Sequence, residues 1–187
     1  GEDEPPAGFT LRFAFGKEEP LWGYTVRYGQ DGVEILLKKA PRLSDDPDAP
    51  LEGVRILLDA GHGGEDNGAS GCAGTDGPLE KDLNLALTLA AKARLEQLGA
   101  WVSLTRSDDS YLSLAQRLEM VNSQAPDFFI SLHHNSIALT RDTLDVNGTE
   151  CYWFTPQSED LAAALTSRFA AAFGCNDRGA REDYYFV

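Results

Sequence analysis

Apolar and polar residues alternate along the first part of the chain in the manner of β-strands. Segments 9–15, 21–28 and 33–39 are rich in aromatic and branched residues, and charged or turn residues separate them. The sequence Gly-Gln-Asp-Gly at residues 29–32 suits a hairpin turn between the second and third segments. We therefore expect a small strand-rich N-terminal segment over residues 1–39.

The pattern then changes. Residues 40–53 contain four acidic residues, three prolines and few apolar residues, which is typical of a linker. Beyond them, strand-like apolar runs at 54–58, 100–105, 127–132 and 149–154 alternate with segments of helical periodicity. This alternation predicts an α/β domain over residues 54–187, in which a mostly parallel sheet has helices on both faces.

The first predicted helix runs over residues 78–98, with Pro78 in its first position and Gly99 as its stop. Its buried stripe is expected to consist of Leu79, Leu83, Ala86, Leu87, Ala90 and Leu98. A second helix is predicted to begin at a capping box of Ser113 and Gln116 and to end near residue 123.

A third helix is expected to be capped by Ser158 and to stop at Gly174. Its apolar residues are Leu161, Leu165, Phe169 and Phe173. Residues 184–187 predict the start of a further strand.

Composition and charge narrow the range of partners. Thirty acidic residues against sixteen Lys and Arg give a net charge of −14, which repels nucleic-acid phosphates and anionic lipid head groups. No apolar run approaches the roughly 18 residues that a membrane span needs. We therefore expect one active site in a domain of ordinary size, with no nucleic-acid partner and no membrane span.

The three cysteines, Cys72, Cys151 and Cys175, have irregular spacing and include no Cys-x-x-Cys pair. They predict neither a disulfide framework nor a thiolate zinc site, and we interpret them as buried or incidental thiols. The chain begins Gly-Glu-Asp-Glu, with neither the basic region nor the apolar core of a signal peptide, so we expect a mature or trimmed chain.

Three short motifs carry the candidate chemistry. They are Leu-Asp-Ala-Gly-His-Gly-Gly at 58–64, Leu-Glu-Lys-Asp-Leu-Asn-Leu at 79–85 and Ser-Leu-His-His-Asn at 131–135, and they offer His62, Glu80 and His133 as possible zinc ligands. Both histidines follow predicted parallel strands, and ligands collect outside the carboxyl ends of such strands. Six glycines between His62 and Glu80 allow the helix start to fold back over the strand ends.

A catalytic zinc site typically has three protein ligands and leaves its fourth position to water. Such a site lowers the pKa of the water and polarises a carbonyl, which is chemistry for amide or ester hydrolysis. Taken singly, each residue is more often structural: an isolated histidine is usually a satisfied or surface residue, and a glutamate in the first turn of a helix usually favours the helix dipole.

Together the motifs resemble those of the zinc-dependent N-acetylmuramoyl-L-alanine amidases, the amidase-3 class of peptidoglycan hydrolases. In that class an Asp-x-Gly-His-Gly-Gly turn, a Glu-Lys-Asp helix start and a Ser-x-His-x-Asn strand end supply the metal ligands. The resemblance covers residues 54–187 in order. It includes Thr105-Arg106, Leu114 to Arg117, Gly148-Thr149-Glu150 and Arg178-Gly179.

The resemblance implies a Zn²⁺ cofactor held by His62, Glu80 and His133, with His134 as a variable position beside the site. It also implies an enzyme that cleaves the amide between N-acetylmuramic acid and L-alanine in peptidoglycan, and an extracytoplasmic location in the periplasm or cell wall. Cell-wall remodelling, daughter-cell separation or lysis are the processes it suggests.

Three further residues are candidates for supporting roles. By the resemblance, Asn135 supports the site through its amide. Asp66 and Asn67 lie in the same Gly-rich loop as His62, and they are either partners of the metal ligands or polar residues that cap the loop.

The sequence departs from the family pattern in one place. Family members carry a second Glu, the general base or acid, on the strand after a Phe-x-Val-Leu-like segment, whereas this sequence ends Tyr-Tyr-Phe-Val at residues 184–187. We therefore expect an apparently truncated domain whose catalytic Glu lies beyond Val187, and weak hydrolysis by a chain that still binds zinc. Glu150 and Glu182 are the nearest acidic substitutes, but neither occupies the family's register.

Two alternatives stay open at this point: a zinc peptidase of another specificity, and a catalytically inactive peptidoglycan-binding module. Some relatives also insert a self-blocking helix after the Ser-x-His-x-Asn strand. Only thirteen residues, 136–148, fill that gap here, which is too few for a helix of about 11–12 residues and its two turns. We therefore expect an open crevice and no requirement for an activator protein.

Overall fold

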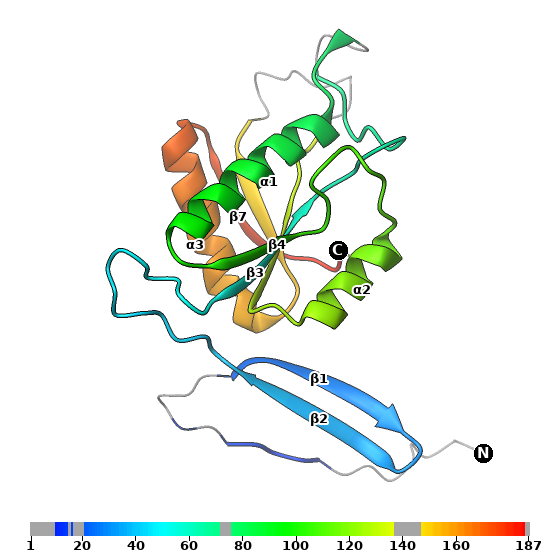
Figure 1. Cartoon of the computed structure of the whole chain (residues 1–187), viewed down its shortest axis with the longest axis vertical. Helices are drawn as coiled ribbons and strands as arrows, with labels where there is room; N and C mark the ends of the chain where they lie inside the picture. The colour runs from blue at the N-terminus through cyan, green and yellow to red at the C-terminus, as the bar shows by residue number, and fades with distance from the viewer. Residues whose placement is uncertain (1–9, 15, 17–20, 72–75, 137–146, 186–187) are drawn as a thin grey trace, which may run out of the picture. The chain divides into compact units, whose positions relative to one another are not determined.

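The computed structural model describes residues 10–14, 16, 21–71, 76–136 and 147–185 (Figure 1). Contacts divide the chain into two compact units, residues 1–40 and residues 41–187. Within the described residues, no helix combines the length and the apolar character that a membrane crossing requires.

The first unit contains an antiparallel hairpin of β1 (Leu21–Gly29) and β2 (Gly32–Lys39), with Gly29 opposite Gly32. This confirms the predicted turn at 29–32. The strand predicted at 9–15 is wrong for residues 10–14, which have no regular structure, while residues 9 and 15 lie outside the described ranges. High β-propensity is insufficient there because a strand also needs a partner for its ladder hydrogen bonds.

The second unit alternates strands and helices. In order, its elements are β3 (Arg55–Ala60), α1 (Glu80–Gln97), β4 (Trp101–Leu104), α2 (Leu114–Gln124), β5 (Phe128–Leu132), β6 (Thr149–Trp153), the 3-10 helix η2 (Pro156–Ser158), α3 (Glu159–Phe173) and β7 (Asp177–Glu182). Strands β4, β3 and β5 form a parallel sheet in that order, and β6 pairs with β7 in parallel. The predicted α/β fold with parallel strands is confirmed.

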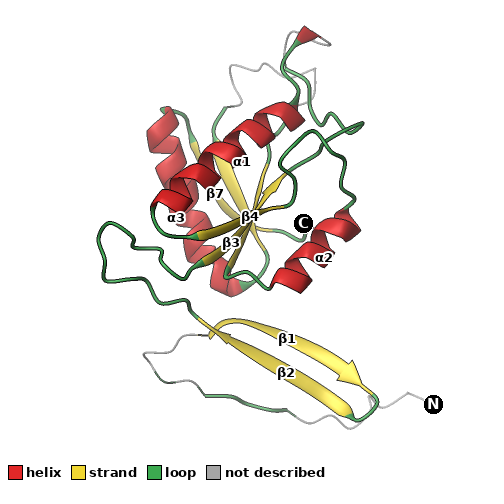
Figure 2. Cartoon of the chain, viewed as in Figure 1, coloured by secondary structure: helices red, strands yellow, loops and turns green. Residues whose placement is uncertain are grey.

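Strand β3 is the centre of this unit. All its residues after Arg55 are buried, as expected for a central parallel strand that is covered on both faces. Val54, Ile56 and Leu58 form the core with Ala100. Helix α1 packs on β3 and β4 and crosses in front of the strands in Figure 2.

Helix α1 corrects two predictions. It begins at Glu80, and its N-cap Leu79 is extended because it bridges to Ser70, so Pro78 precedes the helix instead of occupying its first position. The predicted stripe of Leu and Ala is also wrong, since Leu83 is 40% exposed while Glu80, Asn84 and Thr88 are buried. The first half of the inward face is polar and carries Glu80, while Ala91 and Leu95 further along the helix pack against the core.

The remaining helices follow most of the sequence signals, but Ser158 does not cap α3, because its side chain makes no cap hydrogen bond and contacts Thr155 Oγ1 instead. Ser113 and Gln116 form the predicted capping box of α2, and Gly174 ends α3 in a left-handed conformation. Residues 184–185 are irregular, so the strand predicted at 184–187 is wrong for them, and β7 lies earlier in the chain. Two phenylalanines of α3, Phe169 and Phe173, form a ring contact at its C-terminal end.

Some predictions fall on residues that the structure does not describe. Cys72 is one of them, whereas Cys151 and Cys175 are half-buried free thiols. Burial raises the pKa of the Cys151 thiol. The expectation of an open crevice without a blocking helix concerns residues 136–148, of which 137–146 lie outside the described ranges.

Candidate metal centre

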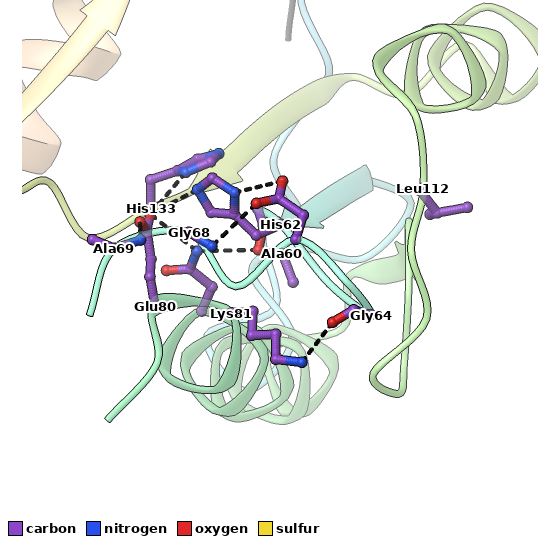
Figure 3. A network of polar contacts seen from close by, with 12 residues as sticks. Ala60, His62, Gly64, Gly68, Ala69, Glu80, Lys81, Leu112 and His133 are labelled. Carbon is purple, nitrogen blue, oxygen red and sulfur yellow. Dashed lines mark hydrogen bonds and ion pairs between the residues drawn. The ribbon is translucent and has the colours of Figure 1, made fainter. Parts of the chain in front are cut away.

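The fold brings His62, Glu80 and His133 together, with one ligand atom of each within 4.8 Å of the others. His62 Nε2 lies 3.3 Å from Glu80 Oε1, and His133 Nδ1 lies 3.0 Å from the same oxygen (Figure 3). His62 follows β3, His133 follows β5, and these strands are adjacent and parallel. Glu80 is the first residue of α1, and the start of this helix lies at the carboxyl ends of the same strands.

The two distances to Glu80 are compatible with ligands of one metal ion. Ligands at about 2.0–2.1 Å around a tetrahedral ion stand about 3.3–3.4 Å from one another. The separations of 3.3 Å and 3.0 Å between Glu80 Oε1 and the two imidazole nitrogens are close to that value, and the three ligand atoms all lie within 4.8 Å of one another. Within the described part of the chain, this is the one group of three or more His, Cys, Asp or Glu residues with such spacing.

Two glycines make this close approach possible. A Cβ on Gly61 would lie 2.2 Å from Cε1 and Nε2 of His133. A Cβ on Gly68 would lie 2.6 Å from His62 Cδ2 and 2.7 Å from Glu80 Oε2, and Gly68 has a φ of +64° that favours glycine. Side chains at these positions would therefore displace the candidate ligands.

His62 is oriented by Asp66, whose Oδ2 lies 2.8 Å from His62 Nδ1. This hydrogen bond is the main reason why the pKa of Asp66 is below its usual value. Because the ionised carboxylate can only accept, this bond uses a proton on His62 Nδ1, and Nε2 is the nitrogen that lies toward Glu80. The structure thus places Asp66 beside His62 as a partner of a candidate ligand.

His62 also has an unusual backbone, with a φ of +63°. A left-handed conformation costs a non-glycine residue about 1–3 kcal/mol and persists only where its surroundings hold it. The loop that carries His62 is therefore under constraint from its neighbours.

Glu80 is a buried carboxylate with several donors around it. Its side chain is 7% exposed, Oε2 accepts from the Ala69 N–H at 2.8 Å, and Oε1 accepts from the His134 N–H at 2.9 Å. Burial raises the pKa of Glu80, but these bonds and the contact with His133 outweigh it, so the pKa lies below its usual value. Glu80 is consequently ionised at neutral pH, the form that binds a cation.

His134 faces a different partner. Its Nδ1 lies 2.7 Å from Oδ1 of Asn84, a fully buried residue that also donates to the carbonyl of Gly61. The side chain of His133, in contrast, is 40% exposed and lies against Glu80. The structure therefore groups His133, and not His134, with the other two candidate ligands.

Asn135 and Asn67 contact the site less directly than the sequence suggested. Asn135 Nδ2 donates to Glu150 Oε1 at 2.6 Å, so its amide holds a carboxylate on β6. Asn67 takes part through its backbone, since its carbonyl accepts from the Lys81 N–H at 3.3 Å. Among the residues that the structure describes, neither side chain forms a hydrogen bond to a candidate ligand.

Glu150 is held as an ionised acceptor. It accepts from the Tyr152 hydroxyl at 2.9 Å and from Arg178 Nε at 3.1 Å. Burial raises the pKa of Glu150, but these hydrogen bonds outweigh burial and leave the pKa below its usual value. Burial and the hydrogen bond to Glu150 raise the pKa of Tyr152 to about 12. A general acid or base works best with a pKa near the operating pH, which this environment does not provide. Glu182, the other candidate, is exposed at the end of β7.

Two buried arginines, Arg106 and Arg117, were missed as site residues by the sequence reasoning. Both donate to backbone carbonyls of the loop that carries His62. The sequence showed them only as parts of motifs, Thr105-Arg106 and Leu114 to Arg117, because their partners are backbone atoms distant in sequence.

A family model described as N-acetylmuramoyl-L-alanine amidase matches residues 56–187. The chain belongs to this amidase family. YqiI of Bacillus subtilis is 35% identical to the amidase chain over 142 residues, which are 74% of this chain and 65% of YqiI. The N-acetylmuramoyl-L-alanine amidase LytC of the same organism is 34% identical over 142 residues, 74% of this chain and 27% of LytC. The amidase chain thus spans less than two thirds of either relative.

Solved structures of amidases share the fold. The catalytic domain of CwlV from Bacillus (Paenibacillus) polymyxa var. colistinus aligns with a TM-score of 0.63 and 37% identity over 71% of each chain. The amidase AmiC2 of Nostoc punctiforme aligns with a TM-score of 0.65 and 33% identity over 73% of each chain. These comparisons confirm the family expected from the three motifs.

Proposed function

We propose that this chain is the catalytic part of a zinc-dependent enzyme that hydrolyses the amide between N-acetylmuramic acid and L-alanine in peptidoglycan. The supporting observation is the cluster of His62, Glu80 and His133 in a chain of the N-acetylmuramoyl-L-alanine amidase family. We place the catalytic domain at residues 54–187, after a strand-rich segment (1–39) and a linker (40–53). The enzyme acts in the periplasm or cell wall, where its substrate lies.

The residues of the cluster suit this chemistry. Zinc, when bound, supplies Lewis acidity that polarises an amide carbonyl and activates water at neutral pH. Glu80 is ionised, and Asp66 fixes the proton of His62 on Nδ1, so both present lone pairs to a cation. The side chains of His62 and His133 are 25% and 40% exposed, which leaves the cluster accessible to a polymeric substrate.

The function is tested by digestion of purified peptidoglycan and mass spectrometry of the products. The proposal predicts intact glycan strands and free peptides that begin with L-alanine, and a metal chelator should stop their release. Peptides cut at another amide would identify a zinc peptidase of different specificity. Binding to peptidoglycan without any cleavage, in protein that contains zinc, would identify a binding module. The reaction should need no activator protein.

A further inference from the structure

Three consecutive backbone carbonyls at the end of β3 are held by two arginine side chains. Arg106 donates from Nε to the Ala60 carbonyl at 2.9 Å and from Nη2 to the Gly61 carbonyl at 3.0 Å. Arg117 donates from Nη1 to Ala60 at 2.9 Å and from Nη2 to the His62 carbonyl at 2.8 Å. Every carbonyl from residue 60 to the candidate ligand is therefore fixed by a guanidinium group.

Arg106 also connects this loop to the helix that carries Glu80. Its Nη2 donates to the carbonyl of Lys81, the residue after Glu80, at 2.8 Å. Its Nη1 donates to the carbonyl of Asp108 at 3.0 Å. One planar side chain thus bonds both the His62 loop and the start of α1.

Arg106 and Arg117 are buried, so we interpret their contribution to the site as the placement of backbone atoms and not as surface charge. Arg106 and Arg117 are each 3% exposed, and burial followed by the charge of Arg117 lowers the pKa of Arg106. Asp59 pairs with Arg117 in the interior. Two positive charges close to a cation site oppose the cation electrostatically, so their net benefit to the site must come from the hydrogen bonds they make.

We propose that Arg106 and Arg117 are positioning residues that hold the metal-binding loop in its ligand geometry before metal binds. The proposal rests on the metal site of the proposed function. It accounts for the left-handed backbone of His62, which needs constraint from its surroundings. It also accounts for the residue type, because the guanidinium has five donors in a rigid fork, whereas lysine has a single flexible ammonium group.

The variants Arg106→Lys and Arg117→Lys keep the charge and remove the fork. We expect each to weaken zinc binding by about 10–100-fold, the usual effect of losing a group that orients a metal ligand. Zinc affinity is measured by competition with a chromophoric chelator. The visible spectrum of the Co²⁺-substituted protein should change as well, because it reports the geometry of the ligands.

Two control variants separate this role from a general effect on folding. Arg55→Lys alters an arginine that donates to the Gln124 carbonyl at 2.6 Å from the opposite end of β3, and zinc affinity should be unchanged. Thr166→Val removes a buried hydroxyl on α3 that donates to Ala162 at 2.9 Å, and it should lower stability without changing zinc affinity.

A measurement on the wild type covers the case in which the lysine variants do not fold. The N–H groups of Gly61, Gly63 and Gly64 donate to Leu132, Asp66 and Asp109 at 3.1, 2.9 and 2.8 Å. If the arginines hold the loop, hydrogen exchange at these amides is already slow in the metal-free protein, and zinc slows it by less than about tenfold.

The outcomes distinguish this proposal from the metal site itself. Lysine variants with wild-type zinc affinity, or amides that become protected only when zinc is added, would overturn the positioning role and leave the metal site standing. A wild-type protein that binds no zinc would instead refute the proposed function. The exchange rates of the metal-free loop would still show whether the loop is ordered before metal binds, as the positioning role requires.

Discussion

Replacing Gly61 by alanine should remove His133 from the metal centre. A Cβ at position 61 would lie 2.2 Å from Cε1 and Nε2 of His133 and 2.6 Å from Nδ1. The backbone of Gly61 is not left-handed, so alanine meets no conformational penalty there and its effect comes from the ring contact alone.

The structure gives the size of the displacement. Non-bonded carbon atoms are comfortable at about 3.5–4.0 Å, so the imidazole must withdraw by more than about 1 Å. Metal–ligand distances tolerate only about 0.2 Å, which means that His133 can no longer coordinate. Zinc affinity should fall by more than the decrease of about 10–100-fold that is typical when a group that orients a metal ligand is lost.

Stability should change much less than affinity. The His133 side chain is 40% exposed, so the ring can turn into solvent without disturbing the core. We expect the free energy of unfolding of the metal-free protein to fall by no more than about 1 kcal/mol.

Zinc competition titrations and thermal unfolding without metal measure the two effects. Gly23→Ala is the matched control, because the nearest contact of its Cβ is Lys38 Cβ at an ordinary 4.0 Å. A Gly61→Ala variant with wild-type zinc affinity would show that the ring of His133 does not lie over Gly61, and the described centre would then be incorrect.

Three further predictions concern single side chains. Asp66→Asn should weaken zinc binding by about 10–100-fold in the same titration because the orienting carboxylate of His62 is lost, and unchanged affinity would contradict that role. His62→Ala should abolish stoichiometric zinc by elemental analysis while His134→Ala retains it, and the reverse would show that His134 binds the metal in place of His62. The pKa of Glu150 is lower in the folded protein than its unfolded value of about 4.3, so ionised Glu150 stabilises the fold above that pH. This contribution disappears as the pH falls through the folded pKa. Urea unfolding should therefore show Glu150→Gln less stable than wild type at pH 6, with the difference narrowing in acid. A gap that does not narrow in acid would refute the assignment.

Local signals in the sequence predicted much of the fold. The apolar run of β3 has little polar alternation because both faces of this strand are buried. The capping box of Ser113 and Gln116 needs only neighbours in sequence. The three motifs also identified the candidate ligands, since each lies at a strand end or helix start. These features depend on short-range chemistry, which a sequence displays directly.

Features that depend on tertiary contacts were missed or mistaken. Helix α1 turns Asn84 and Thr88 inward because Asn84 bonds Gly61 and His134, so its apolar periodicity pointed to the wrong face. Strand β7 is rich in charged residues and is recognisable only through its pairing with β6. The role of Arg117 depends on carbonyls more than fifty positions away in the chain.

A zinc titration of the metal-free protein, with new L-alanine amino termini counted during peptidoglycan digestion, tests the central claim most directly. The account predicts no release without metal and a release rate that rises to one equivalent of zinc per chain and then levels. The position of that break does not depend on the absolute rate. Release that is independent of zinc, or zinc binding with no L-alanine termini produced, would contradict a zinc-dependent N-acetylmuramoyl-L-alanine amidase.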